Sequence, residues 1–336
     1  MWAIMGLNTF TPDYDSYVFR YENSLMFFAG ENFEIEWGYM GLNLIFNYLG
    51  FSYPQFRMFY CAVYAVIAIK AAGRLSDNPN FVLSFLLIWP FLPNVSGQRF
   101  SMAAIILCWG IPFLLERGKK GIIKYLCTLV IAASFHVSII LFVILLCARK
   151  WDISSHLKLL YIASFLLLLF VVFSTQLGEF ASLFNNQKMN MWLNKESEAD
   201  LNRPTLIGFL TNTSSILLAA YVVYKQSNII CKLQSVSDMS KQRVALYKNV
   251  VLLLLLVIPF FVLAGEFYRY LFAILPVIYA VYSYFWNYKK MIPKNSWVRY
   301  AYFALLSIFW PAFLYIIGMK EHNVLSTLTD NILFNG

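Results

Sequence analysis

Long apolar runs, separated by short polar or basic stretches, dominate the chain from about residue 55 onward. Because a helix that crosses a bilayer needs roughly 20 apolar residues, these runs are typical of membrane segments. They predict about ten of them, at residues 55–72, 80–95, 99–116, 122–135, 137–149, 156–176, 205–225, 247–264, 268–287 and 297–318. The shorter apolar stretch at 37–50 predicts an interfacial or re-entrant helix. We therefore expect an all-α, polytopic transmembrane helical bundle that forms a single integral membrane domain over residues 1–336.

The run at residues 122–149 is unusual because both of its ends are basic. A single long helix would place those ends on opposite faces of the membrane and would reverse every later loop. We favour a broken hairpin that bends at Ser134–His136. Each arm would be only about 20 Å long, against a hydrocarbon core of roughly 30 Å. Such arms are tolerated where protein surrounds the bend or water reaches it.

Composition agrees with this pattern. Sixty per cent of the residues are hydrophobic and 13% are charged, with a mean hydropathy of +0.63. A soluble globular chain carries about 25% charged residues, so this chain lacks the polar surface of one. The net charge of +9 could indicate nucleic acid, but the basic residues sit between apolar runs, so we expect no nucleic-acid partner and read the bilayer as the partner.

The basic clusters set the expected orientation. They lie at residues 70–74, 117–124, 149–158, 225–248 and 289–299. Placing all of them in the cytoplasm satisfies the positive-inside rule. The N-terminal stretch, the 93–99 turn, the 265–269 turn and the C-terminus are then outside. So is the 177–204 segment, an expected external loop with an amphipathic helix.

Under this topology, the unusual polar residues gather at the outer ends of membrane segments. An ionisable side chain at membrane depth is costly and is a functional candidate by default. The residues concerned are Asp13, Asp15, Glu36, Gln98, Arg99, His136, Glu266 and Arg269.

Arg99 and His136 are the strongest candidates for chemistry. Arg99 follows a Pro93–Gly97 turn, and its planar guanidinium suits a diphosphate or carboxylate. An interfacial arginine that snorkels to lipid head groups is the alternative. His136 lies between apolar residues and could act as a base or orient an acceptor, or simply pack.

Carboxylates next to aromatic rings occur in two N-terminal stretches. Asp13, Tyr14, Asp15 and Tyr17 form one, and Glu36 and Tyr39 belong to the other. Rings that stack on sugars and carboxylates that bind hydroxyls are usual in glycan sites, although solvated loops with aromatic membrane anchors share this composition.

Glu266 and Arg269 are spaced by three residues, so they can pair on one helical face. Such a pair could bind substrate or close a tight turn. The sequence contains no phosphate-binding loop, zinc-hydrolase motif or serine-hydrolase elbow, and we expect no cofactor and no metal.

The order of these motifs resembles that of the EpsG family, a branch of the Wzy-like polymerases of capsule, exopolysaccharide and O-antigen synthesis. The motifs are PDYDSY, EWGY, QRFSMA, ASFHVS and EFYRY, and the resemblance covers about residues 6–290. Two features depart from the family pattern. Phe100 stands where a glutamine is usual, and the usual first membrane helix is missing or truncated.

The resemblance implies a membrane glycosyltransferase at the outer face of the bacterial cytoplasmic membrane. It would polymerise oligosaccharide repeat units carried on undecaprenyl diphosphate, with a flippase and a chain-length regulator as partners. Arg99, His136, Glu36 and Asp13 would be catalytic. The expected substrate-binding residues are Asp15, Tyr14, Tyr17, Tyr39, Gln98, Glu266 and Arg269.

Two other functions stay open from sequence. One is a transporter or flippase of the lipid-linked unit, which would place charges along a path through the membrane. The other is a membrane acyltransferase that modifies the polysaccharide, with His136 as its base.

Overall fold

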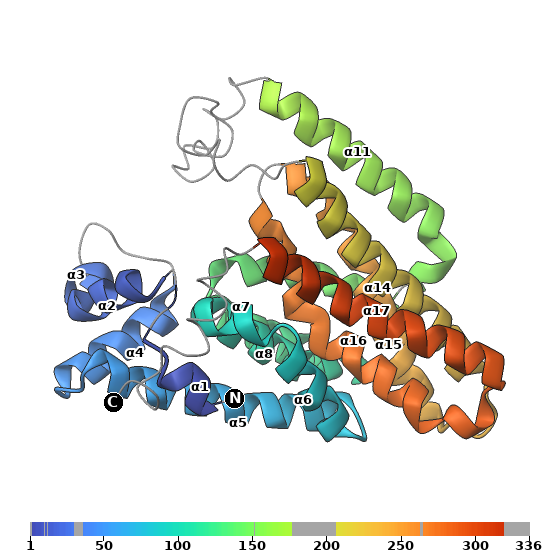
Figure 1. Cartoon of the computed structure of the whole chain (residues 1–336), viewed down its shortest axis with the longest axis horizontal. Coiled ribbons are helices and arrows are strands. Elements are labelled where there is room, and N and C mark those ends of the chain that lie inside the picture. The colour runs from blue at the N-terminus through green and yellow to red at the C-terminus, as the bar shows by residue number, and fades with distance from the viewer. Residues whose placement is uncertain are drawn as a thin grey trace. The chain divides into compact units, whose positions relative to one another are not determined.

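The computed structural model of the chain describes residues 2–9, 11, 13–29, 36–150, 152–176, 206–262 and 265–318 (Figure 1). All of the regular elements within these ranges are helices, as the apolar pattern predicts. The predicted external loop at 177–204 lies outside the described residues. The single membrane domain stays a prediction. The chain divides into two compact units, which we describe separately.

The first unit contains residues 1–146 and 275–287 and the described C-terminal residues from 312 to 318. Its helices are α1 (Trp2–Gly6), α2 (Tyr14–Glu22), α3 (Ser24–Ala29), α4 (Trp37–Tyr48), α5 (Tyr53–Leu75), α6 (Pro79–Ile88), α7 (Phe91–Ser96), α8 (Gln98–Gly110), η1 (Ile111–Leu115), α9 (Gly118–Ala133) and η2 (Val137–Leu145). The long helix α5 packs against α1 and α8 (Figure 1). In turn, α8 packs against α9. The end of α16 joins this unit through Tyr279, whose hydroxyl donates to the carbonyl of Trp89 at 2.7 Å.

Local sequence explains where two of these helices begin. Ser52 caps α5, and the Gln55 side chain accepts from the Ser52 backbone N–H at 2.9 Å. Asn78 caps α6 through the N–H of Phe81 at 3.3 Å, and Pro79 occupies its first position.

The predicted hairpin is present at residues 122–149. α9 ends at Ala133, η2 begins at Val137, and the two arms pack against each other. The hydroxyl of Tyr125 donates to the carbonyl of Phe142 at 2.7 Å, which ties the arms together. The break therefore lies at the predicted Ser134–His136 bend.

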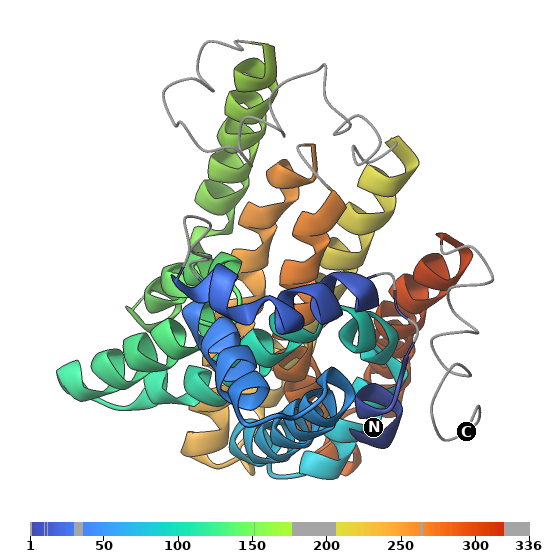
Figure 2. The same cartoon turned by 90° about the vertical axis from the view of Figure 1, so that its left-hand side faces the viewer.

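The second unit contains residues 147–274 and 288–311. Its elements are α10 (Leu146–Lys150), η3 (Ile153–His156), α11 (Leu157–Gln176), α14 (Leu206–Lys232), α15 (Asp238–Leu253), η5 (Leu254–Val262), η6 (Gly265–Tyr268), the start of α16 (Arg269–Asn287), η7 (Lys289–Met291) and most of α17 (Lys294–Gly318). α11 packs along η5 (Figure 2). α14 packs along α15.

Five of the described helical segments are long and apolar enough to cross a membrane. They are Tyr53–Leu75, Gln98–Leu115, Ile153–Phe170, Asp238–Val262 and Arg269–Asn287. The predicted number of about ten spans is thus not confirmed. The segment predicted at 80–95 is divided into α6 and α7, and α9 has 16 residues, so these pieces are short.

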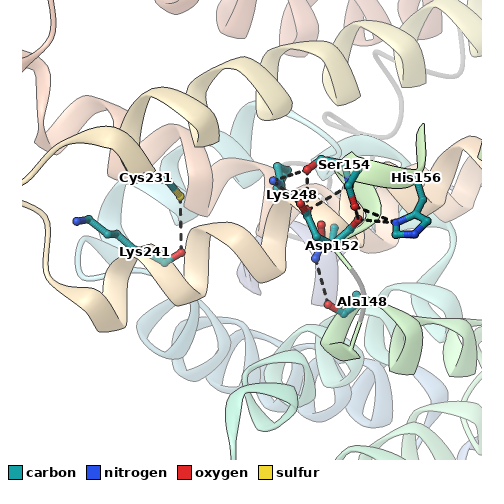
Figure 3. Close-up of polar contacts among 9 residues, drawn as sticks. Ala148, Asp152, Ser154, His156, Cys231, Lys241 and Lys248 are labelled. Carbon is teal, nitrogen blue, oxygen red and sulfur yellow. Dashed lines mark hydrogen bonds and ion pairs between the residues drawn. The ribbon is translucent and has the colours of Figure 1, made fainter. Parts of the chain in front are cut away.

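A polar cluster in the second unit joins two stretches that the sequence predicts to be cytoplasmic (Figure 3). The ammonium group of Lys248, from α15, lies 3.4 Å from Asp152 Oδ1 and 2.9 Å from Ser154 Oγ. Asp152 also caps η3 by accepting from the Ser154 N–H at 3.3 Å. One residue after Lys248, the Asn249 amide donates to the carbonyl of Ala148 at 3.2 Å.

Candidate functional site

The start of α4 is bound to the hairpin bend by hydrogen bonds in both directions. The N–H groups of Gly38 and Tyr39 donate to the carbonyl of Ser134 at 2.9 and 3.3 Å. In return, the Val137 N–H donates to Glu36 Oε1 at 3.3 Å. The first N–H groups of a helix have no partner within that helix, so the bend satisfies groups that would otherwise be unpaired.

Gly38 is required at this junction because the two backbones approach closely. A Cβ atom at position 38 would collide with the Ser134 side chain and lie 3.1 Å from the Ser134 carbonyl oxygen. The EWGY and ASFHVS stretches are therefore two halves of one contact, which places Glu36 beside His136.

Glu36 forms an ion pair with Arg99 from the start of α8. Arg99 Nη1 donates to Glu36 Oε2, while Glu36 Oε1 lies 3.9 Å from His136 Nδ1. The carboxylate is thus shared between a guanidinium and an imidazole. The side chains of Arg99, Glu36 and His136 are 19%, 12% and 21% exposed. They are partly buried but accessible from outside the protein.

Aromatic rings support Arg99. Its guanidinium carbon lies 5.5 Å from the ring centre of Tyr17 and 5.7 Å from that of Tyr39. The two rings meet edge to face at 6.0 Å. A desolvated guanidinium gains about 2 kcal/mol or more from such a contact. Burial raises the pKa of Tyr39 well above its ordinary value, so Tyr39 acts here as a neutral ring.

His136 is oriented by its neighbours. Ser138 Oγ lies 2.8 Å from His136 Nδ1. The ring of Phe100 meets the imidazole edge to face, with centres 5.3 Å apart. Phe100 therefore provides a packing surface for His136.

The other predicted residues divide into two groups. Asp13 lies at the rim, where it is exposed and accepts from Ser96 Oγ at 3.5 Å, and Asp15 is also exposed on α2. Tyr14 is half-buried and packs against the ring of Tyr53. Gln98 is buried beside Arg99 in the chain and does not face outward.

Glu266 and Arg269 belong to the second unit, whereas this cluster lies in the first. Arg269 is an exposed residue of the second unit, and the side chain of Glu266 lies outside the part that the structure describes. The pairing of these two residues stays a prediction.

Arg57 is a buried cation that the sequence pattern did not single out. Only 1% of it is exposed, and its Nε donates to the carbonyl of Met5 at 3.0 Å. With the Gln98 amide oriented so that its oxygen faces the guanidinium, that oxygen accepts from Arg57 Nη2 at 2.8 Å. Arg57 thereby holds the start of α8, next to Arg99. It lies near the outer end of the predicted 55–72 segment, so the rule that selects Arg99 also selects Arg57.

The site has the chemical equipment for anions and hydroxyl groups. Its guanidinium can bind phosphate or carboxylate oxygens, and its imidazole can accept a proton. Among the described residues, no group of three His, Cys, Asp or Glu side chains is arranged to hold a metal ion.

Comparison with protein-family models gives a match to the EpsG family over residues 1–327. Comparison with curated proteins and with solved structures gives no significant match. The family match covers nearly the whole chain, including every element of the site. The chain belongs to the EpsG family, the family of Wzy-like polysaccharide polymerases, and it has a polysaccharide polymerase-type function.

Proposed function

We propose that this protein joins oligosaccharide repeat units carried on undecaprenyl diphosphate into a surface polysaccharide, at the outer face of the bacterial cytoplasmic membrane. A hydroxyl of the acceptor sugar attacks the anomeric carbon of the donor sugar. The new C–O bond forms as the bond to the diphosphate breaks, and undecaprenyl diphosphate leaves with the electron pair. The donor bond is already activated, so the reaction needs no nucleotide.

Arg99 stabilises the leaving group in this proposal. The diphosphate gains negative charge in the transition state, and a fixed cation in a partly dry site stabilises that charge strongly. A guanidinium has five N–H donors, so it can hold Glu36 and a diphosphate oxygen at once. The rings of Tyr17 and Tyr39 fix its position.

His136 accepts the proton of the attacking hydroxyl. If Nδ1 carries the proton and donates to Ser138 Oγ, Nε2 presents a lone pair to the acceptor sugar. The imidazolium that forms is stabilised by Glu36, whose Oε1 is 3.9 Å from Nδ1. Glu36 therefore positions both functional groups.

The rim supplies contacts for the sugars. Asp13 and Asp15 are exposed and can accept from sugar hydroxyls, and the half-buried ring of Tyr14 lies close by. Holding the donor and the acceptor in fixed positions supplies much of the rate by proximity. The reaction calls for a flippase that delivers the lipid-linked units and for a regulator of chain length.

The observation that carries the proposal is the convergence of Glu36, Arg99 and His136 from three separate helix ends. A deletion strain tests it through the length profile of its lipid-linked glycans. Loss of a polymerase leaves single repeat units exposed on the outer face. Single units trapped inside would indicate a flippase, and unchanged chain length with a missing acyl group would indicate an acyltransferase.

The outer location is tested by cysteine labelling with a membrane-impermeant maleimide. The background is a variant whose five native cysteines are replaced by alanine. Asp15→Cys should react in intact cells, whereas Lys119→Cys, in a predicted cytoplasmic loop, should react only after lysis. Both positions are exposed, so the pair is matched in accessibility. The reverse pattern would place the site on the cytoplasmic face and end the proposal.

A further inference from the structure

An apolar groove begins directly beside the candidate site in the first unit. It encloses about 550 Å³ between one face each of α5, α8 and α9. Val63, Ile106 and Ile131 line its middle, and Leu42 and Tyr60 line one end. From Phe59 to Lys70, the groove follows α5 for about 16 Å at 1.5 Å per residue. That length is about half of a hydrocarbon core of roughly 30 Å.

One end of the groove shares its walls with the site. Phe135, which lines the groove, immediately precedes His136 in the chain. The ring centre of Tyr60 lies 6.2 Å from that of Phe135 and 5.6 Å from that of Tyr39. The Tyr39 ring in turn contacts Arg99. Lys70 lies at the other end of the stretch of α5 that lines the groove. The groove therefore begins beside residues that contact Arg99 or adjoin His136, and it runs along α5.

The groove also opens sideways. Ile131 is 51% exposed and Phe59 is 48% exposed, although both line it. In a membrane protein, apolar side chains that are exposed at the surface face the lipid hydrocarbon. A hydrocarbon chain can therefore enter laterally from the bilayer and does not have to thread through the protein.

We propose that this groove binds the polyprenyl tail of the lipid-linked donor, with its diphosphate at Arg99. An apolar groove that ends at a cationic site is complementary to a molecule with an anionic head and a long apolar tail. This inference rests on the proposed function, and it assigns the groove to the lipid that is released in the reaction. Tail binding orients the diphosphate before the bond to the sugar breaks and selects polyprenyl carriers over short-tailed donors.

The test compares two valine-to-tryptophan variants of α5. Val63→Trp fills the groove, whereas Val66→Trp adds the same bulk at a position that is 52% exposed and does not line it. Purified protein in nanodiscs is given a lipid-linked repeat unit with either a full polyprenyl tail or a short, water-soluble prenyl tail. We expect Val63→Trp to raise KM for the full-length donor about tenfold. Its kcat and KM for the short-tailed donor, and all values for Val66→Trp, should match wild type.

A second pair of variants keeps the test valid if Val63→Trp fails to fold. Ile131→Trp fills the groove from an exposed position on α9, and Val130→Trp is its neighbour outside the groove at 54% exposure. Equal KM values for the full-length donor in both members of each pair would show that only bulk lipid occupies the groove. If the groove variants lost equal activity with the full-length and the short-tailed donor, their residues would belong to the candidate site itself. That result would also overturn the proposal. A wild-type protein that is inactive with both donors would instead refute the proposed polymerase function.

Discussion

Two clusters in this protein combine the same kinds of side chain but differ in how they are built. Glu36, Arg99 and His136 meet in the first unit, and Asp152 and Lys248 meet in the second, with His156 close to Asp152 (Figure 3). The Glu36 side chain is 12% exposed, whereas that of Asp152 is 59% exposed. Arg99 is packed against aromatic rings, while the partners of Asp152 are mainly serine residues two or three positions along the chain.

The difference separates a site from a structural cap. Most contacts of Asp152 are local, and they complete the hydrogen bonding at the start of η3. The contacts of Glu36 join residues that are 63 and 101 positions away, and they hold a cation and an imidazole where solvent can reach them. Charged residues that are brought together from distant segments, at a cost in desolvation, are the ones expected to carry function.

The largest expected effect is that of Arg99→Ala. The variant should insert into the membrane but leave single repeat units in place of a polymer ladder. Removing one preorganised charge-stabilising group typically lowers kcat by about 10²- to 10³-fold. Arg99→Lys should recover only part of the activity, because an ammonium group cannot bind two oxygens in a planar fork. Glycan length in complemented deletion cells gives the readout, and a full ladder from Arg99→Ala would remove Arg99 from the mechanism.

The next effect in size is that of His136→Ala. Loss of a general base typically lowers the rate by about 10²-fold or more. The matched control is His156→Ala in the other cluster, which should leave glycan length unchanged because that histidine is exposed and bonds to local groups. If both variants shortened the glycans equally at equal protein levels, the proposed functional difference between the two clusters would be wrong.

A smaller effect is expected from Gly38→Ala, which alters the backbone contact and no functional group. The new methyl group collides with Ser134, so α4 must shift and carry Glu36 with it. Overpacking of this kind costs roughly 1–3 kcal/mol, and we expect an activity loss of about tenfold. Adding Ser134→Gly removes the side-chain part of the collision and should restore part of the activity. A double variant no better than Gly38→Ala would place the damage elsewhere.

The smallest effect concerns Asp152 and pH. Hydrogen bonds from Ser154 and the charge of Lys248 lower the pKa of Asp152. A lowered pKa in the folded state stabilises the protein above the unfolded value of about 4, and this contribution is lost as the pH falls through the lowered pKa. In Asp152→Asn, the melting temperature should therefore fall less steeply than in wild type as the pH drops below about 4. The shift should be small because the side chain is mostly exposed. An unchanged pH dependence would mean that ionised Asp152 does not stabilise the folded protein.

The sequence predicts part of the fold well. Apolar runs predict helices because backbone N–H and C=O groups in hydrocarbon must form their hydrogen bonds within the protein. The basic residues at both ends of the 122–149 run predict the bend at Ser134–His136. The number of spans is harder to predict, since hydropathy alone does not show that the 80–95 run divides into α6 and α7. The amphipathic helix expected at 177–204 stays a prediction, because that segment lies outside the described residues.

The site is predictable in its members but not in its contacts. Arg99, His136 and Glu36 stand out as ionisable residues at the ends of apolar runs. The hydrogen bond between Gly38 and Ser134 joins positions almost a hundred residues apart, and no local pattern specifies it. Arg57 is easily overlooked because it lies within an apolar run, although a charge at that place is itself a signal. The packing of Phe100 on His136 depends on tertiary structure alone.

The most direct test is the rate at which purified protein releases polyprenyl diphosphate from a synthetic lipid-linked repeat unit. The rate should be measured in a single turnover for wild type, Arg99→Ala and Lys248→Ala side by side. If the partly buried Arg99 stabilises the leaving group, release should be about 10²- to 10³-fold slower in Arg99→Ala. The release rate of Lys248→Ala should equal that of wild type. Wild-type release from Arg99→Ala would contradict that assignment.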